Sequence, residues 1–451
     1  MRILLLALTV FIVIGCSDNS SVDNVPISDS MGKKAYSFEN SVKMLNDGKY
    51  TIVIAMSGGG TRAAALSYGV LQALQKQAHP LLQQSNLLNE VDVMSAVSGG
   101  SFTAAYYGLY GDRIFSDYEE RFLYHDVGGD LTTRFFNPLS WFSNQGLTEK
   151  AIGYYQKQLF GDATFADFQR EGSPLIILNA SDLGNGVRFS FLQEYFDFVC
   201  SDLLDYPVAN AVTASSAVPV LFSPVVLKNY DTCEIDDSFL MRDLDALPPI
   251  TRDTLKGLSS YGKKDKRRYI HLVDGGITDN LGLLSLYDIA DLGNGRMEFL
   301  EQTKEQILPH YVIISIDASA KPETDLESSP VPPGISETIS AMTDVQLHRF
   351  NATTYGLIEK WREDYTAMTS KMMGASVETY LININLSELA IDNEDKHRFL
   401  NDIPTSFSLE KEQVDALIKE GSSQLQNHPD YIRFLSNISE QAEFHPKKEI
   451  H

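Results

Sequence analysis

The sequence predicts an α/β fold with a mostly parallel central sheet. Short, continuous runs of apolar and β-branched residues recur along the chain, as in strands that are covered on both faces. Stretches with helical periodicity separate these runs. Glycine-rich turns stand between several predicted strands and the helices that follow them, as expected for strand–turn–helix units.

Each element follows from this pattern in chain order. Residues 50–56 form the first apolar run, and residues 63–77 place apolar side chains on one helical face after a turn of three glycines. A tight turn at residues 97–100 separates the next strand from a helix that begins with small residues. The remaining predicted elements are strands at residues 91–96, 174–179, 269–274 and 311–317 and helices at residues 101–109 and 409–420, the last with Ser408 as a candidate cap.

Composition predicts how the chain is divided. The α/β domain is expected at residues 46–320, with a charged, Pro-containing insertion at residues 233–268 and a Pro-rich loop at residues 320–337. The other segments are a signal peptide at residues 1–15, a polar tether at residues 16–45 and a helical C-terminal extension, packed on the α/β domain, at residues 321–451.

The N-terminus predicts attachment to a membrane. Residues 3–14 are apolar apart from Thr9, too short for a permanent span, and fit the apolar region of an export signal. Residues 13–16 resemble the lipobox of bacterial lipoproteins, which implies cleavage before Cys16 and a lipid on that cysteine. An ordinary signal peptide or an uncleaved anchor is the alternative. Ser17 follows, which in a Gram-negative cell favours the outer membrane.

The net charge and the cysteines indicate which partners and cross-links to expect. The formal net charge of −23 repels nucleic acids and anionic headgroups, so we expect no nucleic-acid partner and assign membrane contact to the lipid anchor. In an exported chain, Cys200 and Cys233 predict a disulfide; two reduced, buried thiols are the alternative. Without a nearby pair of histidines they provide too few ligands for a metal.

The turn around Ser98 has the residue types that a nucleophilic serine needs. Its hydroxyl must stand clear of the backbone, which a sharp strand-to-helix turn between small residues achieves. Residues 96–100 match Gly-x-Ser-x-Gly except at the first position, where Ala96 stands. Alanine is the next smallest residue, so Ser98 is a candidate nucleophile for acyl transfer.

The loop of Gly58, Gly59 and Gly60 predicts an oxyanion hole. Consecutive glycines expose backbone N–H groups, and the following helix adds the positive end of its dipole. A P-loop is excluded because no Gly-Lys-Ser/Thr follows, and the near match to the dinucleotide fingerprint lacks its acidic residue. We therefore expect no nucleotide, no cofactor and no metal in the reaction.

A base is needed to activate the serine, and Asp274 is the candidate. It ends a predicted strand and precedes Gly275 and Gly276, at the strand end where α/β enzymes place catalytic groups. The alternative is a carboxylate that caps the next helix. None of the nine histidines stands in such a loop, and His271, inside the strand, is expected to be a buried structural residue.

Together these segments resemble the patatin-like phospholipases, lipid acyl hydrolases that use a Ser-Asp dyad. The resemblance implies a three-layer α/β/α sandwich, with Ser98 as nucleophile and Asp274 as base. It also implies that the three loop glycines are the oxyanion donors. The matching blocks occur in the order of the family, at residues 57–62, 97–101, 179–183 with 214–219, and 274–276.

The resemblance implies phospholipase A or lysophospholipase-type hydrolysis of a membrane phospholipid or another lipid ester through an acyl-enzyme. Ala96 and Ala63 depart from glycines of the family pattern. Arg62 could orient the glycine loop, meet a lipid phosphate or form a salt bridge. Two other functions remain open: a non-catalytic envelope lipoprotein that binds lipid or a partner on this fold, and an esterase with a Ser-His-Asp triad.

Overall fold

The structure of the chain is a computed structural model. It describes residues 22–27, 35–42, 50–78, 85–129, 146–219, 221–235, 247–292, 310–321, 330, 332–374, 376–387 and 394–444. The predicted signal peptide and Cys16 lie outside the described residues. No described helix is both long enough and apolar enough to cross a membrane.

A twisted eight-stranded sheet forms the centre of the molecule, in the order β10-β9-β2-β3-β4-β8-β7, with β5 paired to β4. Neighbouring strands from β10 to β4 are parallel, whereas β8 is antiparallel to both β4 and β7. The strands are β2 (Tyr50–Met56), β3 (Val91–Val97), β4 (Leu175–Asp182), β5 (Val187–Ser190), β7 (Val225–Lys228), β8 (Tyr269–Asp274), β9 (His310–Asp317) and β10 (Glu378–Asn385).

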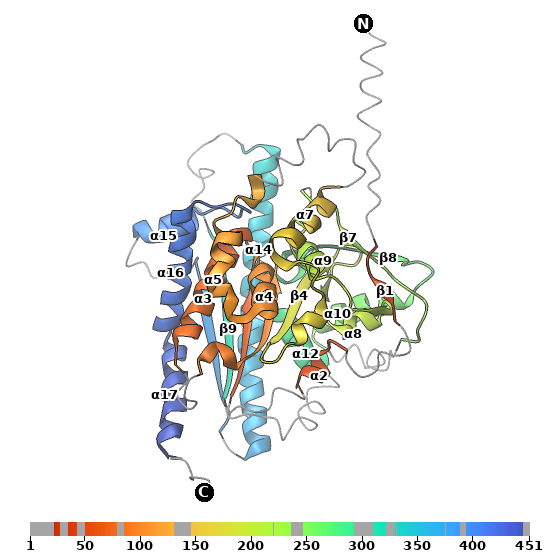
Figure 1. Ribbon diagram of the computed structural model, residues 1–451. Coiled ribbons are helices and arrows are strands. Elements are labelled where there is room, and N and C mark those ends of the chain that lie inside the picture. The colour runs from red at the N-terminus through yellow and green to blue at the C-terminus, as the bar shows by residue number, and fades with distance from the viewer. Residues whose placement is uncertain are drawn as a thin grey trace, which may run out of the picture.

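Helices cover both faces of this sheet, so the predicted fold class is confirmed. Figure 1 shows α4 in front of the sheet and α14 behind it. Strands β2 and β9 are mostly apolar and buried because both faces of the sheet are covered there. The helices are α2 (Phe38–Val42), α3 (Gly60–Lys76), α4 (Gly99–Tyr110), α5 (Ile114–Tyr118), α7 (Leu147–Tyr155), α8 (Gln193–Asp197), α9 (Val208–Ser215), α10 (Pro249–Ser259), α11 (Gly276–Asp279), α12 (Leu283–Leu292), α14 (Ile335–Met373), α15 (Glu394–Asn401), α16 (Lys411–Asn427) and α17 (Pro429–Phe444).

The C-terminal region shares the sheet and the core of the preceding residues. Strand β10 extends the sheet beside β9, and α16 packs along α3. The two helices cross at glycines: a Cβ on Gly69 would lie 2.1 Å from the carbonyl oxygen of Ile418, and one on Gly421 would lie 2.3 Å from that of Leu66. Only glycine permits so close an approach of two backbones. The predicted cap also differs, since Glu410, not Ser408, caps α16.

The region expected to be an irregular insertion contains the helix α10, which begins at Pro249, the second of two consecutive prolines. The charged, Pro-containing composition of this region did not indicate a helix, although Thr251, Leu255 and Leu258 stand at helical spacing and are buried. Upstream, β1 (Val25–Pro26) pairs with β6 (Ser201–Asp202). Close by, Cys200 and Cys233 form a disulfide with their Cα atoms 5.5 Å apart.

Candidate active site

Ser98 occupies the sharp turn between β3 and α4. Its backbone has φ 48° and ψ −118°, a conformation that costs a non-glycine residue about 1–3 kcal/mol. The two residues after it must be glycines, because a Cβ on Gly99 would lie 2.0 Å from the carbonyl oxygen of Gly60 and one on Gly100 2.8 Å from that of Ser57. The strained turn therefore sets the serine directly against the glycine loop.

Asp274 reaches the same place from a strand that runs in the opposite direction. The sequence argument expected a parallel strand, but β8 is antiparallel to β4 and pairs only with its last residues, Ala180 with Asp274. Strand β4 is also aligned with β3, where Asn179 pairs with Val97. The carboxyl end of β8 consequently lies level with the carboxyl end of β3, next to Ser98.

The two side chains form a hydrogen-bonded dyad. The Ser98 hydroxyl donates to Oδ2 of Asp274 at 2.7 Å, and the Gly276 amide donates to Oδ1 at 2.8 Å. Both side chains are buried, and burial raises the pKa of Asp274 from 3.8 to about 6, although the two hydrogen bonds oppose that rise. Neither residue is hydrogen-bonded to a histidine of the described chain. A carboxylate with this pKa is ionised at neutral pH and is a better base than an exposed one.

A buried segment at the end of α9 holds both sides of the dyad. The Ser98 amide donates to Oγ of Ser215 at 2.9 Å, and that hydroxyl donates to the carbonyl of Asn179 at 2.6 Å. Two backbone carbonyls of the same segment also accept hydrogen bonds: that of Ala217 from the Asp274 amide, and that of Ser215 from the Gly275 amide. The nucleophile and the base are thus positioned by one common support.

The glycine loop lies against the dyad, but its three amides differ. The Gly58 amide donates to the carbonyl oxygen of Asn280 at 3.0 Å, so it is engaged within the protein. The amides of Gly59 and Gly60 donate to no group of the described chain. A Cβ on Gly58 would lie 3.3 Å from Cβ of Ser98, which shows how closely the loop faces the serine.

Arg62 ties the glycine loop to the C-terminal region. This buried guanidinium donates to the carbonyl of Ile403 at 2.6 Å and to Oγ1 of Thr405 at 2.9 Å. Next to these residues, the Thr61 amide donates to the carbonyl of Ser406 at 2.8 Å. Burial lowers the pKa of Arg62 to about 10, so it stays charged. Arg62 was expected to orient the glycine loop, meet a lipid phosphate or form a salt bridge, and these contacts favour the first role.

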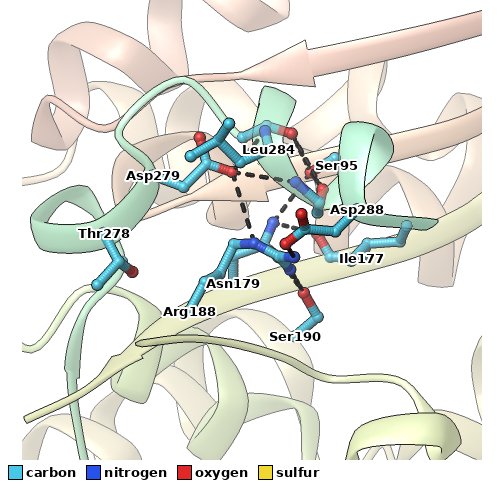
Figure 2. Close-up of polar contacts among 12 residues, drawn as sticks. Ser95, Ile177, Asn179, Arg188, Ser190, Thr278, Asp279, Leu284 and Asp288 are labelled. Atoms are coloured by element: carbon cyan, nitrogen blue, oxygen red, sulfur yellow. Dashed lines mark hydrogen bonds and ion pairs between the residues drawn. The ribbon is translucent and has the colours of Figure 1, made fainter. Parts of the chain in front are cut away.

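A buried ionic cluster joins β5 to α11 and α12 (Figure 2). Arg188 on β5 contacts Oδ2 of Asp288 at 2.6 Å and lies 4.0 Å from Oδ2 of Asp279. Oδ2 of Asp279 also accepts the amides of Leu284 and Ser285, so it is this carboxylate, at the end of α11, that caps α12. Burial raises the pKa of Asp279 to about 6. The cluster fixes the segment that follows Asp274.

The structure brings together the Ser98, Asp274 and glycine-loop residues that the sequence singled out. The expectation of a buried His271 is wrong, because its side chain lies on the exposed face of β8. Sequence reasoning missed Ser215, Arg188 and Asn280 as parts of the site. Ser215 lies in one of the blocks that match the family, but its role, like those of Arg188 and Asn280, depends on contacts with distant segments. Within the described residues, no group of three acidic, His or Cys side chains could hold a metal ion.

Comparison with known proteins identifies the family. The sequence profile of the patatin-like phospholipases matches residues 54–287. The chain belongs to this family. Membership of the patatin-like phospholipases supports a lipid acyl hydrolase activity, as the resemblance implied. No curated protein matches the chain in sequence.

Solved structures of human GIVD cytosolic phospholipase A2 are similar to this patatin-like chain. One has 13% sequence identity and a TM-score of 0.42, over 90% of this chain and 63% of that chain. A second, in complex with methyl gamma-linolenyl fluorophosphonate, has 12% identity and a TM-score of 0.39, over 90% of this chain and 62% of that chain. The chain therefore spans less than two thirds of the length of these structures.

Proposed function

We propose that this patatin-like chain hydrolyses the carboxylic esters of phospholipids or lysophospholipids, with Ser98 as the nucleophile and Asp274 as the base. The observation that carries the proposal is the 2.7 Å hydrogen bond between Ser98 Oγ and Asp274 Oδ2. It occurs at a strained turn that places the hydroxyl against the glycine loop, whose backbone amides an acyl transfer can use.

The reaction has two steps. Asp274 takes the proton of Ser98 as Oγ attacks the ester carbonyl carbon, and it returns that proton to the departing alcohol when the ester bond breaks. Water then loses a proton to Asp274 as it attacks the acyl-enzyme. The bond to Ser98 Oγ breaks, the proton passes to Oγ, and a fatty acid leaves.

The oxyanion of both steps is assigned to the amides of Gly59 and Gly60. They have no internal acceptor in the described chain, unlike the amide of Gly58, which holds the loop to Asn280. The amide of Gly60 also begins α3, so the positive end of that helix dipole adds to the field at the oxyanion. Removal of one such donor typically lowers kcat about 10²–10³-fold.

We also propose that a lipid on Cys16 holds this site at the bacterial envelope, in the outer membrane. The support is the lipobox-like sequence alone, and the acidic surface would otherwise be repelled by anionic headgroups. Cells supplied with labelled palmitate should incorporate it into the wild-type chain but not into Cys16→Ser. Equal incorporation into both chains would contradict the assignment.

A lipid digestion tests the catalytic proposal. Purified wild-type chain, Ser98→Ala, Asp274→Asn and the control Ser67→Ala are incubated with mixed phospholipids, and the products are read by mass spectrometry. Ser67 is a buried serine of α3 whose hydroxyl has no hydrogen-bond partner in the described chain, so its removal should leave activity unchanged. We expect free fatty acid from wild type and Ser67→Ala only, and labelling of Ser98 by a fluorophosphonate probe. A wild-type chain that binds lipid, releases no fatty acid and is not labelled would be a binding protein.

A further inference from the structure

Asn280 connects the two halves of the site. It follows α11, is 4% exposed, and accepts the amide of Gly58 on its backbone carbonyl at 3.0 Å. This bond joins the turn that carries Asp274 to the glycine loop. Because it uses only the backbone of Asn280, it leaves the side chain for another role.

The carboxamide of Asn280 has a defined orientation. Its Nδ2 donates to Oγ of Ser319 at 3.2 Å and lies 3.5 Å from Oδ1 of Asn351, both oxygen atoms that can accept. Ser319 is itself held, since its hydroxyl accepts from Asn351 at 3.0 Å and its amide donates to Asp317 at 2.8 Å. The nitrogen of the amide must therefore face this cluster, and Oδ1 must face away from it.

Oδ1 of Asn280 faces the dyad. A Cβ on Gly276 would lie 3.1 Å from this atom and 3.0 Å from Oδ1 of Asp274, so both oxygens border the space that the missing side chain leaves open. A Cβ on Gly58 would lie 2.8 Å from Asn280 Oδ1 and 3.3 Å from Cβ of Ser98. The side-chain hydrogen bonds of Asn280 in the described chain are made by Nδ2, so Oδ1 is an acceptor beside the nucleophile and the base that is available to a water molecule.

We propose that Asn280 positions the water that hydrolyses the acyl-enzyme; this inference rests on the proposed function. The water donates one hydrogen to Oδ1 of Asn280 and loses the other, as a proton, to Asp274. Its lone pair then points at the carbonyl carbon of the Ser98 ester, where the new C–O bond forms as the bond to Oγ breaks. A water with both hydrogens held in this way has its nucleophilic lone pair oriented.

This role belongs to one step of the reaction. In acylation the nucleophile is Ser98 itself, whose hydroxyl is oriented by Asp274. In deacylation the nucleophile is a water, which only the site can orient. Loss of Asn280 Oδ1 should therefore slow the second step much more than the first, whereas a purely structural defect would slow both.

The test measures the two steps separately in Asn280→Ala. With a medium-chain p-nitrophenyl ester, kcat/KM reports acylation. Decay of the isolated acyl-enzyme, followed by intact-protein mass spectrometry, reports deacylation. We expect decay about 100-fold slower than in wild type, with kcat/KM within about threefold. Asn229→Ala is the matched control, because this buried asparagine bonds the carbonyls of Tyr261 and Arg267 at the opposite end of β8.

Asn280→Asp is the second variant, because it keeps an oxygen toward the water and loses the amide nitrogen that bonds Ser319. It should retain faster acyl-enzyme decay than Asn280→Ala. Equal losses in both steps, an unchanged decay rate, or equal decay in the two variants would overturn the proposal. A wild-type chain that forms no acyl-enzyme at all would instead refute the proposed function.

Discussion

Replacing Asp274 with Asn is expected to stabilise the folded chain at pH 8 while abolishing hydrolysis. Burial raises the pKa of this carboxyl from 3.8 to about 6. Because each pKa unit corresponds to 1.36 kcal/mol, the ionised carboxylate costs the folded state up to about 3 kcal/mol. Asparagine has a similar shape, can still accept from Gly276, and carries no charge to desolvate.

The sign of the pH dependence follows from the same pKa. Below about pH 4 the carboxyl is protonated in both the folded and unfolded chain, so wild type and Asp274→Asn should be equally stable. Between about pH 4 and 6 the unfolded chain ionises first, and wild type loses stability relative to the variant. Above about pH 6 the full difference is present. Asp279, whose pKa is also about 6, contributes equally to both proteins and cancels.

Urea denaturation of the two proteins between pH 4 and 8, followed by circular dichroism, measures this difference in the free energy of unfolding. Ser98→Ala is the matched control, because it keeps the carboxylate and removes the hydrogen bond that lowers its pKa, and should be less stable than wild type at pH 8. The kcat/KM of wild type should rise with pH with a midpoint at about 6. A difference that does not change with pH, or a wild type more stable than Asp274→Asn at pH 8, would refute the reasoning.

Three further changes test the supports of the site. Gly421→Ala places a Cβ 2.3 Å from the backbone of α3 and should lower the free energy of unfolding by about 1–3 kcal/mol, read from urea denaturation. Arg188→Met removes the guanidinium that faces the buried carboxylates of Asp279 and Asp288 and should cost about 3–5 kcal/mol; a cost under 1 kcal/mol would show that the cluster is dispensable. Arg62→Ala releases residues 403–405 from the glycine loop and should lower kcat/KM about 100-fold without unfolding the chain, as circular dichroism can check.

Much of the fold and the candidate dyad could be predicted because their signals are local. A run such as residues 50–56 consists of apolar and β-branched residues because the strand is covered on both faces, and β2 has these bounds. Ser98 was recognisable because a sharp turn needs small residues beside it. Two elements were harder to predict: α10 lies in a charged, Pro-containing stretch, and β10 joins the sheet through contacts with β9 that no local pattern specifies.

By itself the sequence determined the strand–turn–helix units, the serine turn, the glycine loop and the family, since each depends on residues close together in the chain. Only the tertiary structure decided that β8 runs antiparallel and still places Asp274 beside Ser98. It also decided that the Gly58 amide bonds Asn280, whereas the amides of Gly59 and Gly60 donate to no group of the described residues. It also decided the raised pKa of Asp274, because desolvation depends on every segment packed around the carboxyl. Strand pairing, burial and side-chain direction depend on segments far apart in the sequence. They give the serine of this turn a base and nearby backbone amides, which its local sequence cannot specify.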